Sequence, residues 1–302
     1  MGDQLPTGSI VLPSFTKTRH TDPYPFIDPT RPELSAKGKN VIITGGATGI
    51  GNAIGVSFAK AEAKSIVILG RRVEKLEAGK AAISAVAGSE TSVFYKSVDL
   101  SKKEQTVETF DSIAQQVGKI DILIVNAGVY GDAGKMATFS GENLLQTIEL
   151  NVLSVLNTFQ AFLPHAADGA VLLHSSSLMA HAAAVPGSGG YPIAKAAALK
   201  LMDYIAVENP QIRIISTQPA WTPTDLNGND MNATDSLWWL PLILPEAELA
   251  GCFFVWLASP EAAFLKNRFV WSNWDAQELI ERKEEITSSK FLLTWMVNGV
   301  PI

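Results

Sequence analysis

Residues 40–51, with the sequence NVIITGGATGIG, constrain the fold more than any other part of the chain. The apolar, β-branched residues 41–43 predict a short buried strand. Glycine then occupies four of the seven positions 45–51, and a helical pattern follows over residues 53–64. Strand, glycine turn and helix in this order are typical of a phosphate-binding βα unit, because glycines let the backbone approach a pyrophosphate and the helix N-terminus attracts the anion. A simple turn is the alternative, since the spacing differs from the commonest glycine fingerprint.

Strand-like apolar runs alternate with helical segments from residue 39 onward. This alternation predicts an α/β fold in one domain, with a doubly wound parallel sheet of about seven strands and helices on both faces. Ligands of such sheets bind at the carboxyl ends of the strands. The predicted strands are 41–44, 65–69, 92–96, 121–125, 170–174, 213–216 and 268–271, and the predicted helices are 53–64, 74–87, 103–117, 142–163, 191–208 and 247–258.

The chain ends differ in character from the predicted domain, which spans residues 39–285. Residues 1–38 are rich in proline, which argues against a helix there. They are interpreted as an extended arm that lies on the domain or on a neighbouring subunit, with disorder as the alternative. Residues 286–302 form a C-terminal tail, and its apolar part, residues 291–302, is expected to pack against the body or a partner chain.

The alternation is interrupted at residues 222–245, an irregular segment that contains Trp238 and Trp239. A long insert with large aromatic side chains after a strand end is a candidate substrate lid. Core packing of the two tryptophans is the alternative interpretation.

Composition excludes several classes of protein. A net charge of −6 argues against a general affinity for nucleic acid or an anionic membrane. No apolar run is long enough to span a bilayer, and the N-terminus has no secretion signal, so the chain is expected in the cytoplasm. The single cysteine, Cys252, excludes an internal disulfide, and the four histidines lack metal-ligand spacing, so no metal site is expected.

The second predicted strand ends at Leu69 and is followed by Gly70, Arg71 and Arg72. In a dinucleotide-binding fold, an acidic residue near this strand end would hold the ribose 2′-hydroxyl and repel a 2′-phosphate. No acid is present, and the guanidinium of Arg71 is suited to pair with a phosphate. The sequence therefore favours NADP, with NAD as the alternative cofactor. Solvated arginines at a helix start are the simpler interpretation.

Two further strand ends carry residues that suit a nucleotide. Asp99 follows the third predicted strand, where its carboxylate could accept a hydrogen bond from an adenine amino group. Asn126, Ala127 and Gly128 follow the fourth strand and form a small-residue turn, as expected where backbone borders a cofactor.

Tyr191 and Lys195 are the candidate reactive pair. Their i, i+4 spacing places both side chains on one helix face. A free phenol titrates near pH 10, and a neighbouring ammonium favours the phenolate, so a lowered tyrosine pKa is expected. Such a phenol could exchange a proton with a carbonyl or an alcohol.

Other polar residues are expected beside this pair. Ser177 and its neighbour Ser176 follow the apolar residues 171–173, where a hydroxyl could orient a substrate oxygen. Asn151 lies within the predicted helix 142–163, and its amide needs a partner, such as a water that leads to Lys195. Each feature alone also has an ordinary structural explanation.

Over roughly residues 37–282 the chain resembles the short-chain dehydrogenase/reductase family. The resemblance implies a Rossmann-type fold and hydride transfer between NAD(P) and a ketone or secondary alcohol. It implies that Tyr191 is the acid–base residue, that Lys195 holds the nicotinamide ribose, that Ser177 fixes the substrate oxygen and that Asn151 orders a relay water. The matching motifs, in family order, are Thr44-Gly-x-x-x-Gly-x-Gly51, Asn126-Ala-Gly128, Asn151, Ser177 and Tyr191-x-x-x-Lys195.

The resemblance also implies a set of binding residues, with some departures. Ala220 replaces the usual glycine after Pro219, Val125 replaces the first Asn of an Asn-Asn-Ala-Gly pattern, and Ser176 is the fallback for the catalytic serine. The expected cofactor-binding residues are Gly45, Thr48, Gly49, Ile50, Gly51, Arg71, Arg72, Asp99, Leu100, Asn126, Ala127, Gly128, Tyr191, Lys195, Pro219, Thr222 and Thr224, and the expected substrate contacts are Met179, Trp221 and Trp238.

The N-terminal arm and the Trp-containing C-terminal part resemble a subgroup common in filamentous fungi, which implies a substrate from secondary metabolism. The resemblance also implies a homodimer or homotetramer built through helices 142–163 and 191–208. Two other functions stay open at this point. The chain could use the same fold as an isomerase, dehydratase or cyclase, or bind the cofactor as a sensor or scaffold without turnover.

Overall fold

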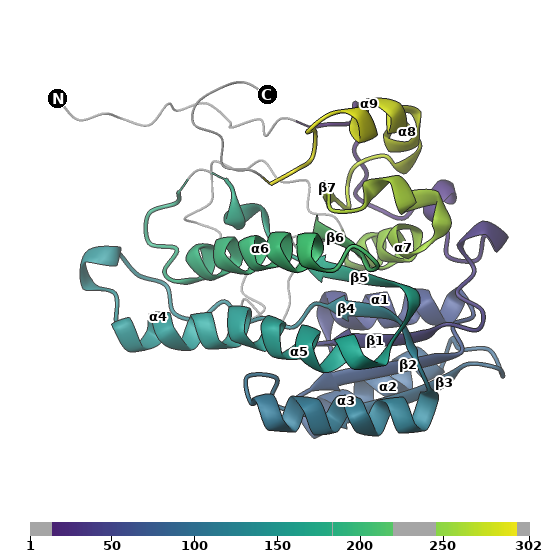
Figure 1. Cartoon of the computed structure of the whole chain (residues 1–302), viewed down its shortest axis with the longest axis horizontal. Coiled ribbons are helices and arrows are strands. Elements are labelled where there is room, and N and C mark those ends of the chain that lie inside the picture. The colour runs from purple at the N-terminus through teal and green to yellow at the C-terminus, as the bar shows by residue number, and fades with distance from the viewer. Residues whose placement is uncertain (1–13, 183, 220–245, 295–302) are drawn as a thin grey trace.

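A single seven-stranded sheet forms the centre of the protein (Figure 1). The computed structural model describes residues 14–182, 184–219 and 246–294. All neighbouring strands are parallel, in the order β3-β2-β1-β4-β5-β6-β7. The strands are β1 (Asn40–Thr44), β2 (Ser65–Gly70), β3 (Ser92–Ser97), β4 (Ile120–Val125), β5 (Ala166–Ser175), β6 (Arg213–Gln218) and β7 (Phe269–Trp271). The predicted doubly wound α/β fold is confirmed.

Helices cover both faces of the sheet, and each layer has its own apolar core. Side chains of α1, α2 and α7 belong to one core, and those of α3, α5 and α6 belong to the other. The helices are α1 (Gly49–Lys60), α2 (Val73–Ser84), α3 (Lys103–Val117), α4 (Gly141–Ile148), α5 (Ser154–Phe162), α6 (Tyr191–Glu208), α7 (Ala247–Ala258), α8 (Ala276–Glu281) and α9 (Lys283–Ser288).

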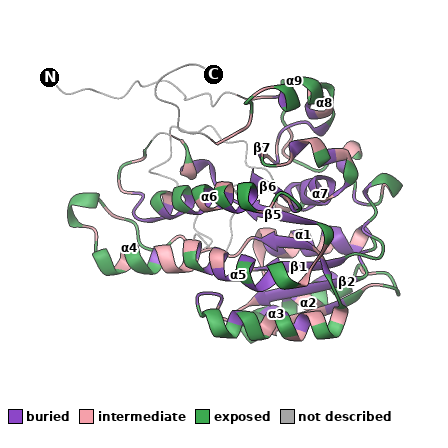
Figure 2. Cartoon of the chain, viewed as in Figure 1, coloured by how far each residue is buried: buried purple, intermediate pink, exposed green. Residues whose placement is uncertain are grey.

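The central strands are buried on both faces, as Figure 2 shows. Every residue of β1 is buried, with Val41 and Ile43 in one core and Ile42 in the other. Strands enclosed in this way have continuous apolar sequences rather than alternating ones. This explains why their sequence predicts a parallel sheet.

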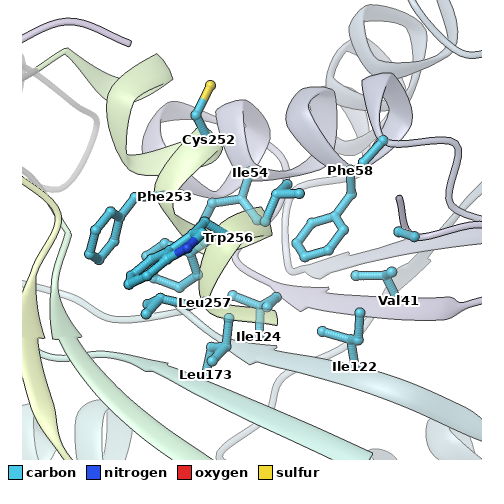
Figure 3. Packing of buried hydrophobic residues seen from close by; sticks show 14 of the residues in the cluster. Val41, Ile54, Phe58, Ile122, Ile124, Leu173, Cys252, Phe253, Trp256 and Leu257 are labelled. Atoms are coloured by element: carbon cyan, nitrogen blue, oxygen red, sulfur yellow. The ribbon is translucent and has the colours of Figure 1, made fainter. Parts of the chain in front are cut away.

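The core beneath α7 contains the largest fully buried side chain of the part of the chain that the structure describes. Figure 3 shows Trp256 and Phe253 of α7 packed beside Ile54 of α1 and above Leu173 of β5. Trp256 is fully buried, and its ring centroid lies 5.1 Å from that of Phe253. This packing joins α7 to α1 and thereby fixes the helix that begins at the glycine turn.

The predicted helix 142–163 is interrupted. A π-helical segment, Glu149–Leu153, separates α4 from α5, and Asn151 lies at its centre. The prediction of one continuous helix is therefore wrong at these residues. Single π-helical turns inside helices occur frequently at functional sites.

The described part of the N-terminal arm packs on the domain of its own chain. Ile27 and Leu34 are buried in the core beneath α7. His20 pairs with Asp275 at 2.8 Å, and Arg31 pairs with Glu261 at 2.9 Å.

The expectation of no helix in the arm is wrong for two single 3₁₀ turns, Pro25–Ile27 and Pro32–Leu34. Each begins with a proline, where the missing N–H costs nothing. The short helices α8 and α9 were also not predicted. Residues 222–245 and 295–302, the predicted lid and the end of the tail, lie outside the described residues.

The strand order reverses direction between β1 and β4. In open α/β sheets, ligands bind beyond the carboxyl ends of strands at such a switch point. The glycine turn follows β1 there, and the Asn126 turn follows β4. Among the described helices, none is long and apolar enough to cross a membrane.

Candidate active site

The turn that leads into α1 requires glycine. Gly45 and Gly49 have φ angles of 67° and 54°, in the left-handed region where a side chain is strained. A Cβ on Gly51 would lie 2.2 Å from the carbonyl oxygen of Gly45. Thr48 caps α1 without a side-chain hydrogen bond, so Gly49 and Ile50 begin the helix with N–H groups available to an anion.

Hydrogen bonds tie the glycine turn to the ends of β4 and β5. Thr44 Oγ1 accepts from the backbone N–H groups of Asn126 at 2.9 Å and Ala127 at 3.0 Å. Asn126 Nδ2 donates to the carbonyl of Thr44 at 3.3 Å, and Asn126 Oδ1 accepts from Ser175 Oγ at 3.0 Å. These contacts bring three strand ends together at the switch point. The roles of Thr44 and Ser175 were not predicted.

Arg71 and Asp99 lie close enough to interact electrostatically. Burial opposes ionisation of Asp99, but hydrogen bonds from Ser101 and the charge of Arg71 outweigh it, so the Asp99 pKa lies below its ordinary value. Arg71 and Arg72 are exposed directly before α2, and Leu100 is buried. The structure therefore places a cation within electrostatic range of a carboxylate at the predicted adenosine end of the site.

Tyr191 and Lys195 are both buried at the start of α6, with 7% and 5% of their surfaces exposed. Lys195 Nζ lies 5.7 Å from the centroid of the Tyr191 ring and donates to the carbonyl of Ser175 at 3.1 Å. A Cβ on Gly128 would lie 3.4 Å from Lys195 Nζ and 2.9 Å from Asn151 Oδ1. The predicted side chains thus meet beside the turn that follows β4.

The expected lowering of the Tyr191 pKa is not observed. Burial raises the pKa of this phenol, a hydrogen bond with Ser177 lowers it, and the neighbouring phenol of Tyr130 raises it further, with a net increase. Burial also lowers the pKa of Lys195 to about 8. Desolvation therefore outweighs the hydrogen bond with Ser177, and Tyr191 is protonated at neutral pH.

Asn151 finds its partners within the protein. Its Nδ2 donates to the carbonyls of Val129 and Thr147, each at 2.9 Å, and its Oδ1 accepts from the N–H of Val129 at 3.1 Å. The amide therefore holds the backbone of Val129 from both sides. The next residue, Tyr130, stacks on Tyr191 with ring centroids 4.8 Å apart.

The three consecutive serines have different surroundings. Ser177 Oγ accepts from the N–H of Met179 at 3.2 Å, and its hydroxyl is close enough to Tyr191 to lower the pKa of the phenol. Ser176 Oγ is buried and has no hydrogen-bond partner among the described residues. Ser175 binds Asn126 instead. Of Ser176 and Ser177, it is therefore Ser177 that influences the phenol.

An apolar cluster surrounds the phenol. Leu178, Met179 and Tyr191 form its buried part, and Tyr130 and Trp271 pack against it. Tyr130 and Trp271 were not predicted, because each reaches the cluster from a different strand end. Met179, one of the expected substrate contacts, belongs to this cluster.

The other predicted residues come after β6 in the chain. Pro219 follows β6, and its carbonyl accepts from the hydroxyl of Ser272. The positions of Trp221, Thr222, Thr224 and Trp238 lie outside the described residues. Within the described ranges, no group of three His, Cys, Asp or Glu side chains could hold a metal ion.

A family model described as short chain dehydrogenase matches residues 39–235, which is more than half of the chain. The chain belongs to the short-chain dehydrogenase/reductase family. Short-chain dehydrogenase/reductases are enzymes, and this one is an NAD(P)-dependent oxidoreductase that binds a small-molecule substrate. The first N–H groups of α1, which no side chain caps, fit the pyrophosphate of the dinucleotide.

Fungal members of the short-chain dehydrogenase/reductase family are similar along nearly the whole chain. The short chain dehydrogenase/reductase nsrO of Aspergillus novofumigatus is 30% identical over 291 residues, which cover 93% of this chain and 96% of that protein. The short chain dehydrogenase pigC of Monascus ruber is 31% identical over 279 residues, which cover 90% of each chain.

Solved structures of the family share the fold. A short chain dehydrogenase from Burkholderia cenocepacia in complex with NADP has a TM-score of 0.71 at 24% identity, and the match covers 80% of this chain and 99% of that one. An alcohol dehydrogenase from Thermococcus sibiricus, complexed with 5-hydroxy-NADP, has a TM-score of 0.59 at 28% identity, over 65% of this chain and 83% of that one.

Burial of Lys195 gives this dehydrogenase a measurable pH dependence. The folded-state pKa of about 8 lies below the ordinary value of 10.5. Below pH 8 the amine is charged in both the folded and the unfolded state, so the full cost of burying the charge lowers the stability of the folded protein there. Between these two values the unfolded chain binds more protons, so stability rises with pH.

We expect Lys195→Met to remove this rise and to stabilise the enzyme at pH 7 by about 1 kcal/mol, because the lost hydrogen bond to Ser175 offsets part of the relieved burial cost. Urea unfolding of both proteins from pH 7 to 10.5 tests this prediction. Parallel stability curves for the two proteins over that range would contradict it.

Proposed function

We propose that the enzyme is an NADPH-dependent reductase that interconverts a ketone and a secondary alcohol, and that its substrate belongs to secondary metabolism. The observation that carries this proposal is the burial of Tyr191 and Lys195 together at the start of α6, with Lys195 Nζ 5.7 Å from the centroid of the Tyr191 ring. Fungal relatives from Aspergillus and Monascus support the metabolic context.

The cofactor would lie along the carboxyl ends of β1, β2 and β4. The glycine turn and the N-terminus of α1 would hold the pyrophosphate, Asp99 the adenine and Arg71 a 2′-phosphate. Lys195 would hold the nicotinamide ribose. When bound, the reduced nicotinamide supplies the hydride for the carbonyl carbon.

The residues around Tyr191 then handle the proton. Ser177 Oγ accepts from the N–H of Met179, so its own proton is available to the substrate oxygen. Tyr191 is protonated at neutral pH and donates its phenolic proton to that oxygen as negative charge develops there. The ammonium of Lys195 stabilises the phenolate that remains. Asn151 holds Val129 and thereby the wall formed by Tyr130.

A panel of ketones tests the proposal. The purified enzyme is mixed with NADPH and each ketone, and the absorbance of reduced nicotinamide is followed. We expect cofactor oxidation with at least one cyclic or aromatic ketone, together with formation of the alcohol. Conversion of a substrate without net cofactor oxidation would indicate an isomerase, dehydratase or cyclase, and tight NADPH binding without any conversion would indicate a sensor or scaffold.

Arg71→Ala is expected to weaken NADPH binding about tenfold and to leave NADH binding unchanged. A charge-assisted hydrogen bond to phosphate contributes about 1.5 kcal/mol at an exposed site, and only NADPH has the 2′-phosphate. Fluorescence titration with both cofactors measures the two dissociation constants. Lys64→Ala, which removes an exposed cation directly before β2, at the opposite end of that strand from Arg71, is the control. An equal loss for NADH would refute the assignment of Arg71.

We also propose that the enzyme is a cytoplasmic homodimer or homotetramer that pairs through the face of α4, α5 and α6. Several apolar side chains of these helices and of the π-helical segment between α4 and α5 are exposed in the single chain. They include Leu145, Leu153, Tyr204 and Val207, with exposed fractions of 68%, 41%, 61% and 77%. Exposed apolar patches of this kind mark protein–protein contacts.

Val207→Asp should therefore shift the particle mass measured by light scattering toward the monomer, because it places a charge in the apolar contact. Val86→Asp, at an exposed valine after α2, is the matched control and should leave the mass unchanged. A monomeric wild-type enzyme would refute this assembly.

A further inference from the structure

The backbone ladder between β5 and β6 ends just before the proposed catalytic serine. Ser175 is the last residue of β5 to pair with β6, and the N–H of Ser176 donates to the carbonyl of Thr217 at 2.8 Å. Ser177 comes one residue later. Regular backbone pairing therefore cannot fix the position of its side chain.

Beyond the end of the backbone ladder, a side chain of β6 binds the segment that follows β5. Gln218, the last residue of β6, accepts the backbone N–H of Leu178 through Oε1 at 2.6 Å. Leu178 is 1% exposed. Since water cannot replace the acceptor there, loss of the Gln218 carbonyl would leave a buried N–H unsatisfied.

Gln218 is itself held firmly. It is buried at 8% exposure, it pairs with Trp271 of β7, and its backbone carbonyl accepts the N–H of Ser272 at 3.0 Å. The side chain of Gln218 therefore extends from β6, a strand that is paired with β5 on one side and with β7 on the other. A side chain anchored in this way can hold the turn after β5 in one position.

The position of the turn after β5 determines the direction in which the hydroxyl proton of Ser177 points. Ser177 caps the 3₁₀ turn Leu178–Ala180, and its Oγ accepts the N–H of Met179 at 3.2 Å. A serine hydroxyl has one proton, so with an acceptor site occupied by Met179 that proton is left for Tyr191 or a substrate oxygen. A displacement of Leu178 would move the N–H of Met179 and rotate this hydroxyl.

We propose that Gln218 is a positioning residue for the reduction, because its hold on Leu178 fixes the direction in which Ser177 donates its proton. This inference rests on the proposed function of the site. Gln218 acts through Ser177 and is not itself in contact with the reacting atoms.

A double-mutant cycle with a ketone that the enzyme reduces tests the inference. Gln218→Met keeps the side-chain length and removes the acceptor, and we expect it to lower kcat roughly 10- to 100-fold with little change in the KM for NADPH, because small misplacements of reacting groups have effects of this size. In a Ser177→Ala background the same change should have no further effect on kcat. Gln218→Glu retains a carbonyl-type acceptor and should recover most of the activity.

Ile215→Met is the matched control, because it changes a buried residue of β6 that packs in the core of α1 and α7. It should leave kcat within about threefold, as volume-conserving core changes usually do. A Gln218→Met loss that persists undiminished in the Ser177→Ala background would show a merely structural role and overturn the inference.

Amide hydrogen exchange provides a readout that needs no substrate. In Gln218→Met, the N–H groups of both Leu178 and Met179 should exchange faster than in the wild type, whereas Ser177→Ala should affect Met179 alone. Unchanged exchange of Met179 in Gln218→Met would overturn the inference. If the wild type reduced no ketone, the proposed function would fail, and the exchange of Met179 would still decide whether Gln218 positions Ser177.

Discussion

Tyr191→Phe is expected to lower kcat for ketone reduction by roughly 10²- to 10⁴-fold while NADPH still binds, because the variant loses only the phenolic oxygen. The ring keeps its packing against Leu178 and Met179 and its stacking on Tyr130. Without the phenol, no proton reaches the substrate oxygen from α6, and Ser177 alone must stabilise the developing charge.

Steady-state kinetics with NADPH, combined with a binding titration, measures both halves of this prediction. Tyr204→Phe removes a phenolic oxygen from the same helix at an exposed position and is the matched control. It should leave kcat unchanged. Full activity of Tyr191→Phe would remove the tyrosine from the mechanism, and loss of NADPH binding would make the defect one of folding or cofactor affinity.

Gly51→Ala should weaken NADPH binding by roughly 100-fold or more. The added Cβ would lie 2.2 Å from the carbonyl oxygen of Gly45 and 2.7 Å from Nδ2 of Asn126. Both neighbours are fixed, since Asn126 is tied to Thr44 and the Gly45 oxygen belongs to the backbone. The helix start must therefore move away from the turn, and a displacement of about 1 Å at a binding site can have this effect.

Isothermal titration with NADPH measures the loss, and circular dichroism verifies that the variant is folded. Gly88→Ala is the control, because a Cβ at Gly88 would meet nothing within 4 Å. It should bind NADPH as the wild type does. A folded Gly51→Ala variant with wild-type affinity would show that the cofactor does not lie against the glycine turn.

Local sequence patterns predicted most of the fold for a physical reason. Strands buried on both faces are continuous apolar runs, so β1 and β5 are recognisable without any tertiary information. The helix α7 was predicted at its exact bounds, because polar residues flank its apolar stretch. The interruption around Asn151 could not be seen, since a π-helical turn adds one residue per turn and hardly disturbs the apolar pattern of the flanking helices.

The candidate site shows where such patterns stop being informative. The spacing of Tyr191 and Lys195 places them on one helix face, and the structure has both beside the same strand ends. Spacing along the sequence does not indicate whether a side chain is buried, however. The predicted direction of the Tyr191 pKa shift was wrong because burial raises this pKa. Gln218 and Tyr130 reach the site from other strands, so only the assembled sheet reveals them.

Transfer of deuterium from the cofactor to the product tests the central claim most directly. The enzyme is incubated with a ketone and NADPH that is deuterated at the transferable position of the nicotinamide, and the product is analysed by mass spectrometry and NMR. We predict an alcohol with one deuterium on the former carbonyl carbon, formed in equal amount to the NADP⁺. A product without deuterium, or one formed without oxidation of NADPH, would contradict hydride transfer at this site.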